Sequence, residues 1–204
     1  MSAESFAADV PGPRVRGKHQ RAAILKRAAD LASLDGLEQV TIGRLASAMQ
    51  MSKSGLYAYF TSKEDLQLAT IHNAWGVFDA HVLEGAETVE EMLRRWIAYY
   101  AHEVFPGGCP LATAAMEFAN RDGPVHDALA GAVQRQHAAI HDAVLRASAE
   151  RLRTDVDADQ VAFEIHAVLL AGNQRFRMSR DPAAFAHTQT AITRLLEPPR
   201  GGDS

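Results

Sequence analysis

The sequence predicts an all-α protein with about nine helices. Apolar residues recur with the helical period of 3.6 along the chain, and no segment shows the alternation and hairpin turns that are typical of strands. Breaks rich in glycine and proline divide this pattern into segments of helical length. The chain has 204 residues, of which 47% are hydrophobic and 23% charged, so it has the composition of a folded globular protein.

The first half of the chain is predicted to form a long helix, two short helices and a second long helix. Gly36 ends the first helix, because glycine accepts a left-handed backbone. Thr41 and Ser52 are suitable N-caps for the two short helices. The second long helix has two alternative starts with the spacing of a capping box, at Thr61 with Glu64 or at Ser62 with Asp65. The expected ranges are 19–33, 42–48, 53–60 and 63–83.

The second half continues with longer helices that stop abruptly. Pro110 and Pro124 suit the first turn of a helix, where no backbone N–H is needed. The expected ranges are 88–104, 110–120, 124 to about 153, about 157–178, and 182–197. The predicted organisation is a flexible N-terminal arm (1–17), a small helical domain (18–64), a larger helical domain (65–197) and a frayed tail (198–204).

Charge is distributed unevenly along the chain. The net charge is -4, but residues 14–63 hold nine Lys or Arg against three Asp or Glu, a net of +6. Such a basic segment suits a polyanionic partner, and the remaining chain is acidic. The alternative is a chance cluster of solvated cations.

The two short helices, braced by the first helix, have the dimensions of a helix-turn-helix, whose second helix enters the DNA major groove. Gly55 would let the backbone approach DNA closely. The N-termini of these helices and of the next offer backbone N–H groups to phosphates. In the alternative interpretation, Tyr57 and Tyr59 only pack and Ser54 faces water. The candidate DNA-binding residues are Thr41, Arg44, Ser52, Lys53, Ser54, Gly55, Tyr57, Tyr59 and Lys63.

The segments 41–46, 52–60 (SKSGLYAYF) and 62–66 (SKEDL) resemble the N-terminal domain of TetR-family transcriptional regulators. The resemblance covers about residues 18–70. It implies a homodimer that binds a palindromic double-stranded DNA operator, with Thr41, Lys53, Tyr57, Tyr59 and Lys63 at positions that the family uses against DNA. The sequence departs from the family at Gln50, where a turn glycine is usual, and at Tyr59, where histidine is common.

The resemblance also implies a helical C-terminal domain with a small-molecule pocket and a dimer interface. The segment 157–178 carries two apolar stripes, so we expect one to pack on the core and one on a partner chain. Gly172 would allow close approach of backbones there. The expected interface residues are Val161, Ile165, Leu169, Gly172 and Phe176, with Phe185 and Ile192 from the last helix. The other stripe is Phe163, Ala167, Leu170 and Gln174.

Bulky aromatic and soft side chains of the middle helices are the pocket candidates, because they combine an apolar body with a polar handle. For each of them the alternative is ordinary core packing. Cys109 is either a thiol switch at a helix start or a small buried residue. His137 and His141 alone do not predict a metal site, and no cofactor is expected. The pocket candidates are Trp75, Phe78, Trp96, Tyr99, Tyr100, Cys109, Met116, Phe118 and His137.

These observations favour a cytoplasmic transcriptional regulator, a repressor rather than an activator, that an unknown small-molecule effector releases from DNA. No apolar run is long enough to cross a membrane, no secretory signal is present, and the single cysteine suits a reducing compartment. No nucleophile with a base and no phosphate-binding glycine loop is visible, so an enzyme is not expected. The first alternative is an architectural DNA-binding protein without a ligand, and the second, less favoured one is a helical enzyme whose groups are assembled only in the fold.

Overall fold

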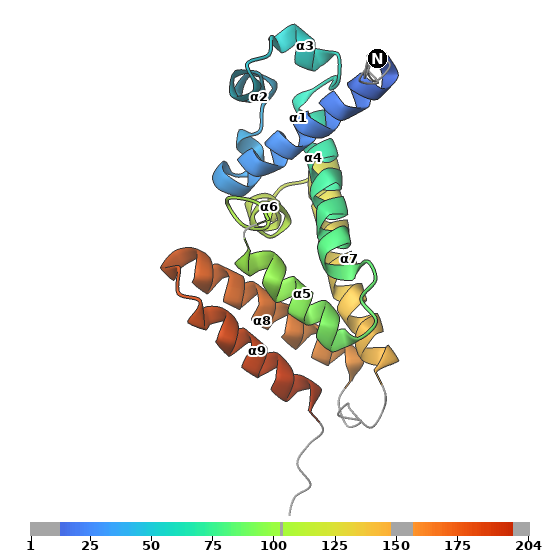
Figure 1. Ribbon diagram of the computed structural model, residues 1–204, viewed down its shortest axis with the longest axis vertical. Coiled ribbons are helices and arrows are strands. Elements are labelled where there is room, and N and C mark those ends of the chain that lie inside the picture. The colour runs from blue at the N-terminus through green and yellow to red at the C-terminus, as the bar shows by residue number, and fades with distance from the viewer. Residues whose placement is uncertain (1–12, 103, 148–156, 198–204) are drawn as a thin grey trace, which may run out of the picture.

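The computed structural model describes residues 13–102, 104–147 and 157–197, and within them it contains nine α-helices and no strand (Figure 1). The all-α prediction is therefore confirmed. Two short helical turns, η1 and η2, lie between the α-helices. The elements are α1 (Pro13–Asp35), η1 (Leu37–Gln39), α2 (Ile42–Met49), α3 (Lys53–Tyr57), α4 (Lys63–Phe78), η2 (Asp79–Leu83), α5 (Val89–Ala101), α6 (Pro110–Phe118), α7 (Pro124–Arg146), α8 (Ala158–Ser179) and α9 (Ala183–Leu196).

The helices α1, α2 and α3, with the start of α4, form one end of the molecule, which we call the head (residues 13–64). The apolar face of α1 includes Ile24 and Ala28, which are fully buried. Leu45 from α2, Leu56 from α3 and Phe60 after α3 are also fully buried in the same cluster. The helix α2 thus packs onto α1, and α3 packs onto α2, so the two short helices take their orientation from this buried cluster.

The long helix α4 connects the head to the remaining helices, which we call the body (residues 65–197). Leu66 and Phe78, near its two ends, are both fully buried in one continuous apolar cluster. Beyond Phe78 the helix widens into the π-helical turn η2, in which Glu84 N donates to the Asp79 carbonyl at 2.9 Å. In the body, α4 packs beside α7, and α5 and α7 pack against α8 (Figure 1).

The last two helices, α8 and α9, form a closely packed hairpin. A Cβ added to Gly172 of α8 would lie 2.0 Å from Oγ1 of Thr188 on α9, so only glycine permits this approach. Further along, the rings of Phe176 and Phe185 are 4.7 Å apart. The close approach predicted at Gly172 therefore exists, but it joins two helices of one chain.

Several helix ends differ from the predicted ones. α1 begins at Pro13, so residues 13–17 are helical where an arm was expected. α3 ends at Tyr57 and not at residue 60, because the N–H groups of Tyr59 and Phe60 both donate to the Leu56 carbonyl and tighten the chain into a turn. α5 ends three residues earlier than expected, at Ala101, and α7 ends at Arg146. Residues 1–12 of the predicted arm, the predicted helix end near residue 153, and the predicted tail 198–204 lie outside the described residues.

The turn between α2 and α3 is built on Gln50, the position where a family glycine was expected. Gln50 has φ 53° and ψ 37°, a left-handed conformation that is unfavourable for a residue with a side chain. It is held by hydrogen bonds at the end of α2, from Gln50 N to the Ser47 carbonyl (3.3 Å) and from Met51 N to the Ala46 carbonyl (2.9 Å). The turn therefore has the geometry of a glycine turn without the glycine.

We expect Gln50→Gly to raise the free energy of unfolding by about 1 kcal/mol, because it relieves the left-handed strain. Chemical denaturation at fixed protein concentration measures this change. The matched control is Ala48→Gly, which introduces glycine two residues earlier on the exposed side of α2. That variant should be less stable by about 1 kcal/mol. Equal destabilisation by both variants would contradict the strain at Gln50.

Candidate nucleic-acid interface

Each helix of the head that follows a turn begins with a hydroxyl cap. Thr41 Oγ1 accepts from Arg44 N at 3.2 Å, Ser52 Oγ accepts from Gly55 N at 3.0 Å, and Ser62 Oγ accepts from Asp65 N at 3.0 Å. Of the two alternative starts for α4, Ser62 is therefore the N-cap. Asp65 reaches back one residue further than in a capping box, because its Oδ2 accepts from Thr61 N at 2.8 Å. These caps fix where α2, α3 and α4 begin.

The exposed side of α3 carries a cation, a hydroxyl and an aromatic ring. Lys53, Ser54 and Tyr57 are exposed, and Tyr57 itself is 56% accessible. Tyr59 is half-buried and lies beside Phe60, with ring centroids 6.5 Å apart. Packing beside Phe60 therefore explains the partial burial of the Tyr59 ring, whereas the Tyr57 side chain stays exposed. Gly55 is half-buried, and a Cβ added there would lie 3.2 Å from Ser52 Oγ. A side chain at this position would therefore crowd the N-cap of α3.

The three candidate cations of the head differ in their partners. Arg44 pairs with Asp35 at 2.5 Å, and Lys63 pairs with Glu38. Among the described residues no acid pairs with Lys53, whose stem lies against Gly43 of α2. Of these three cations, Lys53 is therefore the one whose charge has no acid partner among the described residues.

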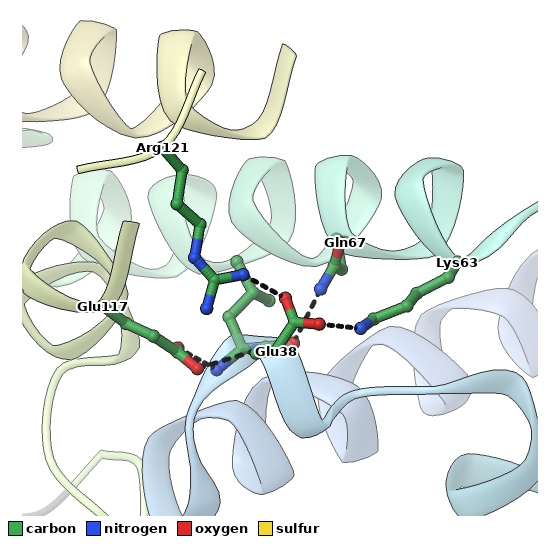
Figure 2. Close-up of polar contacts among 6 residues, drawn as sticks. Glu38, Lys63, Gln67, Glu117 and Arg121 are labelled. Carbon is green, nitrogen blue, oxygen red and sulfur yellow. Dashed lines mark hydrogen bonds and ion pairs between the residues drawn. The ribbon is translucent and has the colours of Figure 1, made fainter. Parts of the chain in front are cut away.

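The head joins the body through polar contacts around η1, which Figure 2 shows. The carboxylate of Glu117, on α6, accepts from the backbone N–H groups of Leu37 (2.7 Å) and Glu38 (3.1 Å). Gln67 of α4 donates to the Leu37 carbonyl at 3.0 Å in a buried position. Gly36 has φ 90°, and a Cβ there would lie 2.9 Å from Glu117, so both its backbone and its space require glycine.

Glu38 is the central acid of this joint. One carboxylate oxygen binds Lys63 of the head, and the other accepts from Arg121 of the body at 2.6 Å (Figure 2). The hydrogen bond from Lys63, and after it the one from Arg121, lower the pKa of the Glu38 carboxyl. Sequence reasoning missed Glu38, Glu117 and Arg121, because these partners lie about 80 residues apart and no local pattern marks them.

A second contact joins head and body at the other end of α6. Gly107 N, just before α6, donates to Ser33 Oγ of α1 at 2.9 Å. A Cβ on Gly107 would lie only 1.8 Å from the Ser33 carbonyl oxygen, so the two backbones touch directly. The helix α6 is therefore fixed to the head at both of its ends.

The structure brings together five of the predicted pocket residues. Phe78 lies between Trp96 (centroids 4.7 Å apart) and Tyr99 (5.6 Å), and Tyr100 and Cys109 are buried beside them. His166, which was not predicted, lies 5.8 Å from the Trp96 ring. Trp96 Nε1, the Tyr99 hydroxyl and His166 Nε2 are buried and lack a well-formed hydrogen bond to any described residue, although the Tyr99 hydroxyl lies close to the Cys109 thiol and Trp96 lies close to the Tyr100 hydroxyl. Burial lowers the pKa of His166 and raises those of Tyr99 and Tyr100, so all three are neutral near pH 7.

The other four pocket candidates lie around or outside this group of five. Met116 is 79% exposed on α6, and Phe118 lies under the Arg121 guanidinium, 4.5 Å from it. Trp75 is half-buried beneath Arg135, and His137 pairs with Asp159 at 2.8 Å on the partly exposed α7–α8 side. Trp75 also borders the aromatic cluster, because its ring lies 5.5 Å from that of Phe78. The pocket role of these four residues stays a prediction.

A separate cavity of about 120 Å³ lies between η2, α5 and α7. Small-molecule sites generally enclose about 300–1,000 Å³, so this cavity is too small for a typical ligand. It contains none of the predicted pocket residues; its lining is Leu83, Ala86, Thr88, Met92, Ala139, Asp142, Ala143 and Arg146.

The predicted dimer residues face the interior of their own chain. Val161, Ile165, Leu169, Gly172, Phe185 and Ile192 are all buried within the single chain, and Phe176 packs on Phe185. The body core and α9 thus already cover most of that stripe within one chain, and its role in a dimer interface stays a prediction. The second apolar stripe of α8 is the outward one, with Phe163 62%, Leu170 39% and Met178 84% exposed.

Among the described residues, no group of three or more His, Cys, Asp or Glu side chains could hold a metal ion. No described helix is both long and apolar enough to span a lipid bilayer.

A helix-turn-helix head that exposes a cation and an aromatic ring on its second short helix, seated on an all-helical body, defines a DNA-binding regulator. Two family models match the chain. That of the bacterial regulatory proteins of the tetR family matches residues 24–70, and that of the tetracyclin repressor-like C-terminal domain matches residues 85–192. The chain belongs to the TetR family of transcriptional regulators, which are DNA-binding proteins and not enzymes.

Solved structures of similar fold include TetR-family regulators from three bacteria. The regulator from Chloroflexus aurantiacus J-10-FL has 23% identity and a TM-score of 0.77 over 88% of this chain and 95% of its own. The regulator from Agrobacterium tumefaciens has 18% identity and a TM-score of 0.76 over 88% and 98%. The one from Cytophaga hutchinsonii has 22% identity and a TM-score of 0.74 over 89% and 94%. No curated protein sequence matches the chain.

We expect Cys109 to be unreactive in the folded protein. It is 2% exposed, and burial raises the pKa of its thiol more than the donors at the start of α6 lower it. Ellman's reagent should therefore titrate one thiol per chain only after denaturation. Cys109→Ser provides the blank. Rapid labelling of the folded protein near pH 7.5 would contradict the buried position and favour a thiol switch.

Proposed function

We propose that this regulator binds a palindromic DNA operator as a homodimer and represses transcription until a small-molecule effector releases it. The observation that carries the DNA-binding step is the exposed face of α3, where Lys53 has no acid partner among the described residues and Tyr57 is 56% accessible. Leu56 and Phe60 are fully buried on the opposite side and hold this face outward. Because DNA lies in the bacterial cytoplasm, the proposal also assigns the protein to that compartment.

Charge supports this orientation of the molecule. Residues 14–63 carry a net charge of +6, whereas the complete chain carries -4. A polyanion would therefore be attracted to the head and repelled by the body. In a symmetric dimer the two α3 helices would contact successive major grooves, which requires a spacing of about 34 Å.

The aromatic cluster of the body supports an effector site. The three buried polar atoms on Trp96, Tyr99 and His166 lack a well-formed hydrogen bond to any described residue, and such atoms are costly unless a ligand or water satisfies them. They lie within apolar walls from Phe78 and Phe105. A ligand with an apolar body and a few polar atoms would satisfy them, but it would have to open the cluster. Opening would move α4 and α5, which carry these rings.

The outward stripe of α8 supports the homodimer. Phe163, Leu170 and Met178 recur at helical spacing on one face and leave large apolar surfaces exposed. Exposed apolar patches of this kind are typical of protein interfaces. Two copies of the α8–α9 hairpin would bury this stripe in a symmetric contact, in which the same residues serve on both sides.

The DNA-binding proposal predicts that Lys53→Ala and Tyr57→Ala weaken binding. Genomic fragments selected by the purified protein supply the operator, and fluorescence anisotropy measures the affinity. Each variant should lose about 1–3 kcal/mol of binding free energy while its thermal unfolding stays unchanged. The control Arg94→Ala removes the same charge as Lys53→Ala from an exposed position of α5, away from the head and from the α8–α9 hairpin, and should retain full affinity. Wild-type affinity in both head variants would refute the assignment.

The dimer proposal predicts that Leu170→Arg shifts the protein to monomers, because two buried, unpaired cations would face each other across the symmetric contact. Analytical ultracentrifugation over a concentration series measures this shift. Val133→Arg is the control, since Val133 is 37% exposed on α7 and Leu170 is 39% exposed on α8. A dimeric Leu170→Arg variant would exclude this face, and a monomeric wild type would exclude the homodimer.

A further inference from the structure

Lys63 occupies an unusual position for a residue expected to bind a DNA phosphate. It stands in the first turn of α4, and its ammonium group is paired with Glu38 of η1 (Figure 2). A phosphate would have to compete with that carboxylate. The side chain of Lys63 is nevertheless 38% exposed, so solvent and ions still reach it.

A cation from the body shares the same carboxylate. Arg121 follows α6 and binds the second oxygen of Glu38 at 2.6 Å. Its guanidinium also lies 4.5 Å from the centre of the Phe118 ring, and Arg121 N donates to the Phe118 carbonyl at 3.0 Å. These contacts tie the position of the Arg121 charge to the end of α6.

The charges of the three side chains determine what DNA would meet. With Arg121 in place, two cations share one anion, and the cluster has a net charge of +1. Without Arg121, Glu38 and Lys63 neutralise each other, and the cluster offers no net charge to a phosphate. The exposure of all three side chains, between 34% and 44%, keeps the energy of each pair small, but their net charge still acts on a nearby polyanion.

We propose that Glu38 and Arg121 are positioning residues for Lys63: Glu38 retains the lysine, and Arg121, held by the body, occupies the same carboxylate and so leaves Lys63 able to bind a DNA phosphate. This inference rests on the proposed DNA-binding function. It assigns to α6 a direct electrostatic effect on the head. A displacement of α6 that withdrew Arg121 would lower the DNA affinity even if the helix-turn-helix kept its internal structure.

The test is the salt dependence of DNA binding, measured by anisotropy with a labelled genomic operator fragment at several KCl concentrations. Each phosphate that a cation neutralises contributes about 0.9 to the slope of log K against log salt. Glu38→Gln should bind more tightly, with a slope steeper by up to about 0.9 per head. The Arg121→Gln variant should bind more weakly than the wild type, with a shallower slope. The Arg121→Lys variant keeps the positive charge and should bind like the wild type.

Two double variants distinguish an effect of Arg121 that passes through Glu38 from a direct effect of the Arg121 charge on DNA. In the Glu38→Gln background, Arg121→Gln should weaken binding less than it does in the wild type, because the carboxylate that links Arg121 to Lys63 is gone and only the direct effect of the Arg121 charge remains. In the same background, Lys63→Gln should abolish the gain. If Arg121→Gln weakens binding equally in both backgrounds, Arg121 acts without Glu38 and the inference is wrong. If the gain of Glu38→Gln persists without Lys63, the inference is wrong as well.

The matched control is Glu91→Gln on α5. It makes the same charge change and also breaks a salt bridge, with Arg95 at 2.6 Å, whose side chains are similarly exposed. The Glu91→Gln variant should leave the DNA affinity and its salt slope unchanged. Thermal unfolding verifies that every variant is folded. If wild-type protein binds but Glu38→Gln equals Glu91→Gln, only this inference fails. If the wild type binds no genomic fragment, the proposed function fails and the inference with it.

Discussion

The docking of α6 against the end of α1 is the contact on which the arrangement of head and body depends. At the start of α6, Gly107 meets the Ser33 backbone so closely that no side chain would fit. At its end, Glu117 binds the N–H groups of η1. A helix held at both ends moves with the element that holds it. Any change in the body that shifts α6 must therefore rotate α1, strain these contacts or break them, and each of these outcomes alters the position of the reading helix.

Local signals in the sequence predicted the elements of the head well. The caps Thr41, Ser52 and Ser62 act within three residues, so their effect is readable from sequence, and the structure confirms all three. The sequence also showed that position 50 lacks the usual turn glycine. It did not show that the backbone keeps the left-handed conformation with glutamine at that position. The helix α3 is shorter than predicted, because the final turn tightens on the Leu56 carbonyl and periodicity does not register such a change.

The body was harder to predict, because its contacts join residues far apart in the chain. The helix α8 is apolar on two sides, and periodicity alone gives no sign of which side faces inward. The inward side is the one that carries Gly172, because Thr188 of α9 leaves no room for a Cβ at that position. The joint at Glu38 likewise depends on a partner 83 residues away. The aromatic cluster was predicted in part, since large apolar side chains belong in a core, whereas the exposed Met116 shows that residue type alone does not fix a location.

The seam between α8 and α9 has a consequence for how such proteins diversify. Because Gly172, Thr188 and the rings of Phe176 and Phe185 complete the hairpin inside one chain, the outward residues of α8 contribute little to the folding of that chain. In the proposed homodimer, substitutions at Phe163, Leu170 and Met178 would therefore change which chains pair without unfolding the subunit. A bacterium that carries several related regulators could keep them from forming mixed pairs by changing this stripe alone, through a few repulsive side chains.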